Sequence, residues 1–200
     1  MNKVTAVVLA AGLSRRMGQR NKMLLPIAGE AMMLRTLRAY LGVFDDVLIV
    51  TGFEADKIGA AVAHLNLRIV HNPDYEDGQA SSVAVGLRAA PNADHVVIGL
   101  GDQPLLRRGE LELLVKTHLS RGGTKITVPH NGTSRGNPIV VPGRLLPEIL
   151  EDKQNPGCGM FTRTRPDLVD FVSLPNQGFF YDVDTPDEYA ELEAETHFAC

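Results

Sequence analysis

Apolar residues follow two different spacings along this chain. Short runs rich in Val, Ile and Leu predict strands at 4–10, 46–51, 67–71, 94–99, 125–129, 138–142 and 168–173. Longer stretches with apolar residues at helical spacing predict helices at 31–41, 55–64, 79–89, 109–120, 144–152 and 186–195. Such alternation is typical of an α/β protein. We therefore expect a single Rossmann-like, three-layer domain over 1–200, in which helices cover both faces of a mostly parallel sheet.

The composition excludes several classes of protein. Of the 200 residues, 44% are hydrophobic and 22% charged, so disorder of the whole chain is excluded. No apolar run reaches the roughly 18 residues of a membrane helix. Two cysteines, Cys158 and Cys200, and six scattered histidines lack the spacing of a disulfide framework or a zinc site. We predict a cytoplasmic protein without a membrane partner, in which both cysteines are bystanders.

Positive charge is concentrated near the start of the chain. The whole protein carries 20 Lys and Arg against 24 Asp and Glu, a net charge of -4 that argues against nucleic acid as a partner. Residues 1–29 nevertheless contain five basic residues and no acid, and four of these lie between Arg15 and Lys22. A local cation cluster in an acidic protein favours a small polyanion as ligand. The alternative is a solvated basic loop.

The loop that holds these cations follows the first predicted strand directly. Its sequence begins Ala10-Ala11-Gly12, whose small side chains let backbone N–H groups approach an anion. It has neither the Gly-Lys-Ser/Thr end of a Walker loop nor the Gly-x-Gly-x-x-Gly pattern of dinucleotide-binding enzymes. We predict a triphosphate site, with a tight strand-to-helix connection as the alternative.

Six sequence blocks resemble one enzyme family. The string LAAGLSRRMGQRNKMLL resembles the signature loop of nucleotidyltransferases, and most of all that of the molybdenum cofactor cytidylyltransferases. VTGFEADKI, HNPDYEDGQASSV, GLGDQPLL, PHNGTSRGNPIVV and YDVDTPDEY continue the likeness in family order, from residue 4 to about 190. The resemblance implies a domain of the nucleotide-diphospho-sugar transferase type.

The resemblance also implies how a nucleotide is bound. Arg16 and Lys22 would hold the β- and γ-phosphates and act as catalytic residues together with Asp102. Base, ribose and neighbouring groups would lie against a larger set of residues. These are Leu9, Ala10, Ala11, Gly12, Thr51, Asn72, Gly78 and Ser82. For Gly78 and Ser82, the alternative is a role as loop and cap residues.

Two aspartates match the family's metal ligands. Asp102 follows an apolar strand, and Asp184 lies in the run Asp182-Val183-Asp184-Thr185-Pro186. Mg²⁺ takes few protein carboxylates alongside phosphate oxygens, so these two would suffice. Asp182 shares a face with Asp184 on an extended strand and is an alternative ligand. The alternatives without metal are a turn-forming role for Asp102 and a helix N-terminal acid at Asp184.

The acceptor is expected to contact Gly136, Asn137 and Pro138, which resemble the family's Gly-Asn-Pro segment. The segment 155–160, which includes Cys158, departs from the Gly-Asp-x-Gly-Ala-Arg pattern of relatives. The implied reaction transfers CMP from CTP to the phosphate of molybdenum-bound molybdopterin and releases pyrophosphate, with Mg²⁺ as cofactor. A xanthine-dehydrogenase-family apoenzyme would then be a possible partner.

Three alternatives stay open at this stage. A guanylyltransferase or sugar-type nucleotidyltransferase would use the same loop, although Ala10-Ala11-Gly12 in place of Ala-Gly-Gly favours a pyrimidine base. A noncatalytic carrier of the molybdenum cofactor would need no metal and pyrophosphate machinery. A nicotinamide oxidoreductase is disfavoured by the missing glycine pattern.

Overall fold

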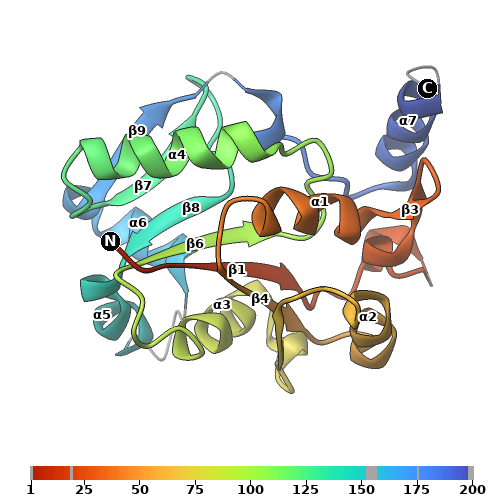
Figure 1. Cartoon of the computed structure of the whole chain (residues 1–200), viewed down its shortest axis with the longest axis horizontal. Coiled ribbons are helices and arrows are strands. Elements are labelled where there is room, and N and C mark those ends of the chain that lie inside the picture. Colours follow the sequence, from red (N-terminus) through yellow and green to blue (C-terminus); the bar gives the residue numbers. More distant parts are fainter. Residues whose placement is uncertain (1, 19, 152–156, 175, 198–200) are drawn as a thin grey trace.

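The computed structural model describes residues 2–18, 20–151, 157–174 and 176–197. Seven strands form a sheet in the order β5-β4-β1-β6-β8-β7-β9 (Figure 1). Adjacent strands pair in parallel except at β8, which is antiparallel to both β6 and β7. The predicted mostly parallel sheet is therefore confirmed. The strands are β1 Val4–Ala10, β4 Asp46–Thr51, β5 Arg68–His71, β6 His95–Leu100, β7 Ile126–His130, β8 Ile139–Pro142 and β9 Val169–Ser173.

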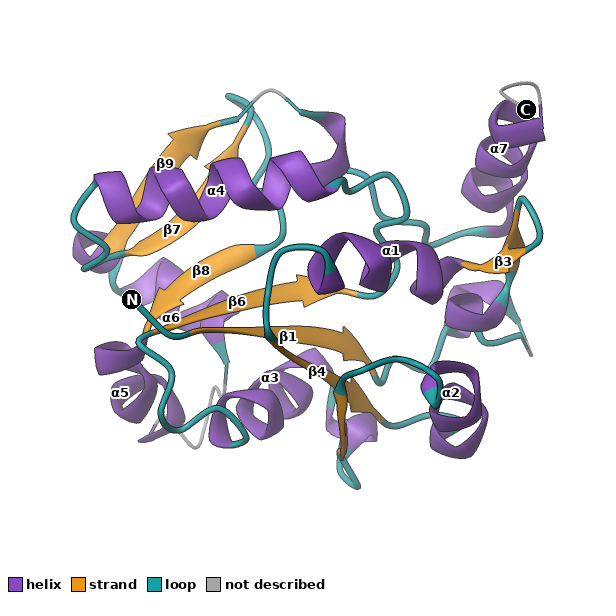
Figure 2. Ribbon diagram, viewed as in Figure 1, coloured by secondary structure: helices purple, strands orange, loops and turns teal. Residues whose placement is uncertain are grey.

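Helices cover both faces of this sheet (Figure 2). Side chains alternate along β1, so that Ala6, Val8 and Ala10 join one hydrophobic cluster whereas Val7 and Leu9 join another. The first cluster includes residues of α1 Met32–Leu41, α2 Ala55–Val62 and α4 Arg108–Ser120. The second includes residues of α3 Gln79–Arg88, α5 Leu146–Glu151 and α6 Cys158–Thr164. Within the described residues, no helix is both long and apolar enough to cross a membrane.

A small third cluster fixes the C-terminal helix α7 Pro186–His197 against the segment between β1 and α1 (Figure 1). It joins α7 to the hairpin formed by β2 Pro26–Ile27 and β3 Glu30–Ala31. The Tyr189 hydroxyl donates a hydrogen bond to the carbonyl of Pro26 (2.6 Å). This contact brings the segment before α7 close to the loop after β1.

Strand register brings the ends of β1 and β6 together. Ala10 pairs with Thr51 of β4, and Leu9 pairs with Leu100 of β6. The Gly101 N–H donates to the Leu9 carbonyl (2.9 Å) just beyond the last paired residues. The loops that follow these strands therefore leave the sheet at the same carboxyl edge, which is where open α/β sheets bind their ligands.

Candidate active site

The loop after β1 is held in a fixed shape by its own polar groups. Ser14 adopts a left-handed conformation (φ 51°), and its hydroxyl accepts a hydrogen bond from the Lys22 N–H (3.1 Å). The Asn21 carboxamide oxygen accepts from the Met23 N–H (3.1 Å), and its NH₂ group donates to the Phe53 carbonyl (3.3 Å). These bonds place two short 3₁₀ turns, Arg15–Met17 and Lys22–Leu24, beside the same cleft.

Three aspartates converge opposite this loop. The Val183 N–H donates to the Asp102 carbonyl (3.1 Å), which ties the segment before α7 to the end of β6. One carboxylate oxygen from each of Asp102, Asp182 and Asp184 lies within 4.8 Å of the others. The positions of both Asp182 and Asp184 therefore agree with the two alternatives that the sequence left open.

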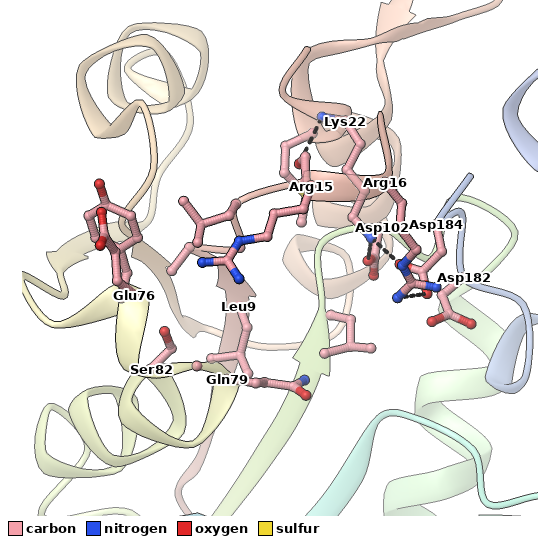
Figure 3. Close-up of a pocket in the computed structure, with 18 residues that line it drawn as sticks. Leu9, Arg15, Arg16, Lys22, Glu76, Gln79, Ser82, Asp102, Asp182 and Asp184 are labelled. Carbon is pink, nitrogen blue, oxygen red and sulfur yellow. Dashed lines mark hydrogen bonds and ion pairs between the residues drawn. The ribbon is translucent and has the colours of Figure 1, made fainter. Parts of the chain in front are cut away.

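The start of α7 stabilises this segment further. Glu188 accepts hydrogen bonds from the N–H groups of Asp184 and Thr185 (2.8 Å each), and the Glu188 N–H donates to the Thr185 hydroxyl (3.3 Å). This is the reciprocal capping arrangement of a helix N-terminus. Asp184 thus has a fixed backbone next to the cap, and its carboxylate points toward Lys22 and Arg16 (Figure 3).

Lys22 bridges two of the aspartates. Its ammonium group forms ion pairs with Asp102 Oδ2 and with Asp184 Oδ1 (2.7 Å). The Lys22 and Asp102 side chains are only 10% and 9% exposed, so this pair is shielded from water. Arg16 contacts the other oxygen of Asp184 (2.8 Å), but its side chain is 68% exposed.

The pKa values of these groups follow from their neighbours. Burial alone would lower the pKa of Lys22, but attraction to Asp102 and Asp184 outweighs it and raises the pKa. Burial would raise the pKa of Asp184, but Lys22 and Arg16 outweigh it and lower the pKa. Asp182 has a raised pKa because of burial and the nearby negative charges of Asp102 and Asp184. Lys22 and Asp184 therefore stay charged at neutral pH.

The same carboxylates have the chemistry of a hard-cation site. Asp102 Oδ1 is buried and has no hydrogen-bond partner among the described residues, although a buried carboxylate oxygen normally has one. Oxygen atoms from Asp102, Asp182 and Asp184 form the donor set that Mg²⁺ or Mn²⁺ prefers. These residues fit a divalent cation that would also bind phosphate oxygens.

A cleft of about 470 Å³ lies between the loop, the aspartates and α3 (Figure 3). Arg16, Lys22 and the aspartates gather at one end, while Ser82 and Glu76 lie at the other and Arg15 lies between them. The sequence-predicted residues that line it are Leu9, Ala11, Gly12, Arg16, Lys22, Gly78, Ser82, Asp102 and Asp184. The cleft is also lined by residues not among those predictions, including Leu13, Ser14, Tyr75, Glu76 and Gln79.

Three predicted nucleotide contacts are not part of this lining. Ala10 and Thr51 are buried partners in the sheet, and Thr51 borders a separate hollow next to β5. Asn72 is fully buried behind the cleft, where its NH₂ group donates to the hydroxyls of Ser81 and Ser82 (2.9 Å each). Its carboxamide oxygen accepts from the Asp74 N–H (3.0 Å). Asn72 therefore supports the cleft wall, a role that its position at the end of a strand did not reveal.

A second cavity of about 600 Å³ adjoins the first, and Leu9, Gln79 and Leu100 line both. Of the three residues expected to contact the acceptor, Gly136 and Asn137 line this cavity, whereas Pro138, which follows Asn137 through a cis peptide bond, does not. A methyl group at Gly136 would lie 2.7 Å from the Phe179 carbonyl oxygen, so only glycine fits there. The Gln103 NH₂ group donates a hydrogen bond to the Asn137 carbonyl (3.1 Å).

Arginines and a cysteine also line this second cavity. Arg135 and Arg163 are not among the sequence predictions, although Arg135 directly precedes the predicted Gly136 block. Cys158, expected to be a bystander, is buried in the wall, and burial raises the pKa of its thiol to about 12. Of the divergent segment 155–160, residues 155 and 156 lie outside the described part of the chain, as does Cys200.

Comparisons with known proteins agree with this geometry. Residues 6–168 match the MobA-like NTP transferase domain. The chain belongs to this family of nucleotidyltransferases. It is 31% identical to nicotine blue oxidoreductase of Paenarthrobacter nicotinovorans, covering 94% of this chain and 96% of the relative. It is 30% identical to molybdenum cofactor cytidylyltransferase of Escherichia coli, covering 94% and 95% of the two chains.

A solved structure adds a metal to the comparison. The manganese complex of Rv0371c from Mycobacterium tuberculosis superimposes with a TM-score of 0.75 at 26% identity. The match covers 96% of this chain and 98% of that one. The predicted fold and family are thus confirmed, and the family's nucleotidyltransferase architecture extends over almost the whole sequence.

Proposed function

We propose that this MobA-like protein transfers CMP from CTP to the phosphate of molybdenum-bound molybdopterin and releases pyrophosphate. One observation carries the proposal. The cations of the loop after β1 and the carboxylates of Asp102 and Asp184 meet at one end of a cleft that adjoins a second cavity. That arrangement suits a transfer between a triphosphate and a separate acceptor. The relative named molybdenum cofactor cytidylyltransferase suggests which acceptor it is.

The nucleoside would occupy the end of the cleft away from Lys22 and the aspartates. Base and ribose would lie along Leu9, Ala11 and Gly12, with Gly78 and Ser82 on the opposite side. Ala11 lines the cleft at the position where guanylyl relatives usually have glycine, and its methyl group occupies space that a glycine would leave open. A smaller space favours a pyrimidine, and we therefore propose CTP over GTP.

The triphosphate would extend toward the charged end. Arg16 and Lys22, which line the cleft together with Arg15, would hold the β- and γ-phosphates. Asp102 and Asp184, with Asp182 beside them, would hold the divalent cation. Bound there, Mg²⁺ would neutralise phosphate charge, and the manganese complex of the mycobacterial relative is consistent with such a site.

The proposed reaction needs no protein base. An oxygen of the acceptor phosphate is already ionised and attacks the α-phosphorus, forming a new P–O bond. The bond between the α-phosphorus and the oxygen that bridges to the β-phosphate breaks, and pyrophosphate leaves with that electron pair. Arg16 and Lys22 would stabilise the negative charge that develops on the leaving group. The protein's contribution is positioning and charge neutralisation.

The acceptor would enter through the second cavity. Ile98, Val128 and Ile139 give this cavity an apolar surface for a flat heterocycle. Gly136 and Asn137 would contact the acceptor directly, and Pro138 would support them from behind. The product would then be passed to a molybdenum enzyme of the xanthine-dehydrogenase family.

The decisive experiment measures pyrophosphate release with Mg²⁺ and molybdenum-loaded molybdopterin, offering CTP, GTP and ATP separately. We expect release with CTP and a cytosine dinucleotide product by mass spectrometry. Preference for GTP would overturn the base assignment and keep the reaction class. Binding of both ligands without release would favour the carrier.

A matched pair of variants tests the metal ligands in the same assay. Asp102→Ala removes a buried carboxylate of the cluster, whereas Asp187→Ala removes an exposed one at the start of α7. We expect the first to lower the rate by at least roughly 10²-fold while the protein stays folded, and the second to leave it near wild type. Wild-type turnover in Asp102→Ala would remove this residue from the metal site.

A second candidate function comes from the relative named nicotine blue oxidoreductase, which is 31% identical to this chain. Under that alternative, the same fold would support a redox reaction. Protein-dependent transfer of hydride from a reduced nicotinamide cofactor to nicotine blue, followed by the loss of the reduced cofactor's near-ultraviolet absorbance, would favour it. A cofactor that stays reduced would leave nucleotidyl transfer as the better proposal.

A further inference from the structure

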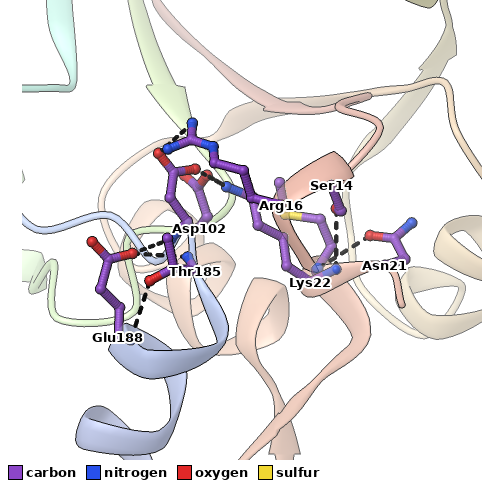
Figure 4. A network of polar contacts seen from close by, with 9 residues as sticks. Ser14, Arg16, Asn21, Lys22, Asp102, Thr185 and Glu188 are labelled. Carbon is purple, nitrogen blue, oxygen red and sulfur yellow. Dashed lines mark hydrogen bonds and ion pairs between the residues drawn. The ribbon is translucent and has the colours of Figure 1, made fainter. Parts of the chain in front are cut away.

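The ammonium group of Lys22 lies where a divalent cation bound to Asp102 and Asp184 would have to lie. It contacts Asp102 Oδ2 and Asp184 Oδ1 at the same time, and the Lys22 side chain is only 10% exposed. The two carboxylates thus already have a buried counterion that belongs to the protein. Figures 3 and 4 show that the lysine reaches them from the loop on the other side of the cleft.

A metal ion and this ammonium group compete for the same oxygens. Cations held against one carboxylate pair repel each other strongly where water is excluded. To admit the metal, Lys22 must move away, yet it is too buried to lose its carboxylate partners without a replacement. Among the described residues, Lys22 forms ion pairs only with Asp102 and Asp184. The polyphosphate of a bound nucleotide would supply the replacement in the same cleft.

We propose that Lys22 makes divalent-cation binding depend on the triphosphate: it neutralises Asp102 and Asp184 in the nucleotide-free protein and exchanges them for phosphate when metal and nucleotide arrive together. This inference rests on the proposed function in one respect, namely that the cleft binds a nucleoside triphosphate. It makes Lys22 a specificity-determining residue that selects the metal–triphosphate complex over the free metal ion.

The local structure allows this exchange. The Lys22 backbone is anchored through its N–H to the Ser14 hydroxyl (3.1 Å), so only the flexible side chain has to swing. Asp102 Oδ1 is buried without a partner among the described residues, so Lys22 satisfies only one of the two oxygens of this carboxylate. Arg16 covers the outer oxygen of Asp184 from a largely exposed position, where water can replace it.

The test is Mn²⁺ binding without nucleotide, read from the loss of the free-ion EPR signal. Lys22→Met keeps the length of the side chain and removes the charge. Arg15→Met removes the same charge from the same cleft at a residue that has no carboxylate contact in the described part of the chain. We expect Lys22→Met to bind Mn²⁺ at least tenfold more tightly than wild type and Arg15→Met to change the affinity less than threefold. Equal gains in Mn²⁺ affinity in the two variants would mean that any cation of the cleft weakens Mn²⁺ binding, and would overturn the specific role of Lys22. Unchanged or weaker Mn²⁺ binding by Lys22→Met would also overturn the proposal.

A measurement on the wild-type protein covers the case in which Lys22→Met fails to fold. Binding of labelled CTP is measured by equilibrium dialysis with and without Mn²⁺. Because linkage is reciprocal, a tenfold gain in Mn²⁺ affinity from CTP requires a tenfold gain in CTP affinity from Mn²⁺. Nucleotide-free wild type that binds Mn²⁺ as tightly as the CTP complex does would refute the exchange.

These outcomes separate the inference from the proposed function. The EPR comparison needs neither acceptor nor turnover. Coupled Mn²⁺ and CTP binding without pyrophosphate release would keep the role of Lys22 and overturn the proposed acceptor. Product formation by an enzyme that binds Mn²⁺ tightly without nucleotide would keep the reaction and overturn the role of Lys22.

Discussion

A buried histidine pair should make the stability of this protein depend on pH. His118 of α4 is 1% exposed and lies against His95 of β6, with 2.9 Å between His118 Nε2 and His95 Nδ1. The other ring nitrogen of His118 lies 2.8 Å from the hydroxyl of Thr127 on β7. Both ring nitrogens of His118 are therefore engaged inside the protein, and there is no acidic side chain in either contact to stabilise an added proton.

The sign and size of the effect follow from the pKa of His118. Burial, reinforced by the nearby His95, lowers it from 6.5 to about 4. Burial also lowers the pKa of His95, despite the attraction of Asp94. Above the unfolded value near 6.5, His118 is neutral in both states and its full contribution to stability is present. As the pH falls from 6.5 toward 4, the unfolded chain gains the proton before the folded protein does. The free energy of unfolding therefore falls, by up to about 3 kcal/mol at pH 4.

Urea unfolding between pH 7.5 and pH 4.5 measures this loss. His118→Gln removes the titrating group, keeps a polar side chain, and should have a shallower pH dependence than wild type. His64→Gln, which removes an exposed histidine after α2, serves as the control and should keep the wild-type slope. An NMR titration should show the His118 ring neutral until pH approaches 4. Identical slopes for wild type and His118→Gln, or a ring that is protonated by pH 6, would refute the reasoning.

Three further outcomes test the walls of the two cavities. Asn72→Ala should lower the free energy of unfolding by about 2 kcal/mol and raise the KM for CTP, because Ser82 loses a buried donor; urea unfolding and kinetics measure the two effects. Gly136→Ala should raise the KM for the acceptor and leave that for CTP unchanged in steady-state assays, because the new methyl group would displace Phe179. Cys158, with its thiol pKa raised by burial to about 12, should resist iodoacetamide at pH 8 until urea unfolds the protein, as mass spectrometry would show.

Most of the fold could be predicted because its signals are local. Each strand of the main sheet is an apolar run that one short window contains, and the helices that cover it repeat their apolar residues at helical spacing. The helix Cys158–Thr164 is not predicted because it has only seven residues and follows Gly157, whose φ is 109°. The hairpin of Pro26–Ile27 and Glu30–Ala31 has two residues per strand, too few to show an alternation.

The site could be predicted only as far as its parts are short motifs. Arg16, Lys22 and Asp102 lie in recognisable loops at strand ends, and the structure places all three at one cleft. Asp184 could be paired with Asp102 only through the family resemblance, because the hydrogen bond from Val183 that ties the two segments spans 81 positions of sequence, which no local pattern encodes. Asn72 has the residue type and position of a ligand contact, but it faces inward to the serines of α3. The direction in which a side chain points depends on the tertiary structure, whereas its type can be read from the sequence.

The two cavities explain how one sheet edge can serve a displacement reaction. In-line transfer at phosphorus requires the attacking and leaving oxygens to lie on opposite sides of the reacting atom. Leu9, Gln79 and Leu100 line both cavities, so a phosphorus atom above them would border each. In the proposed reaction the cations and carboxylates of the first cleft would then lie on the side of the leaving pyrophosphate, and the acceptor would approach from the second cavity. Leu9 belongs to β1 and Leu100 to β6, paired in register at the centre of the sheet, so this geometry is set by backbone pairing between the two central strands.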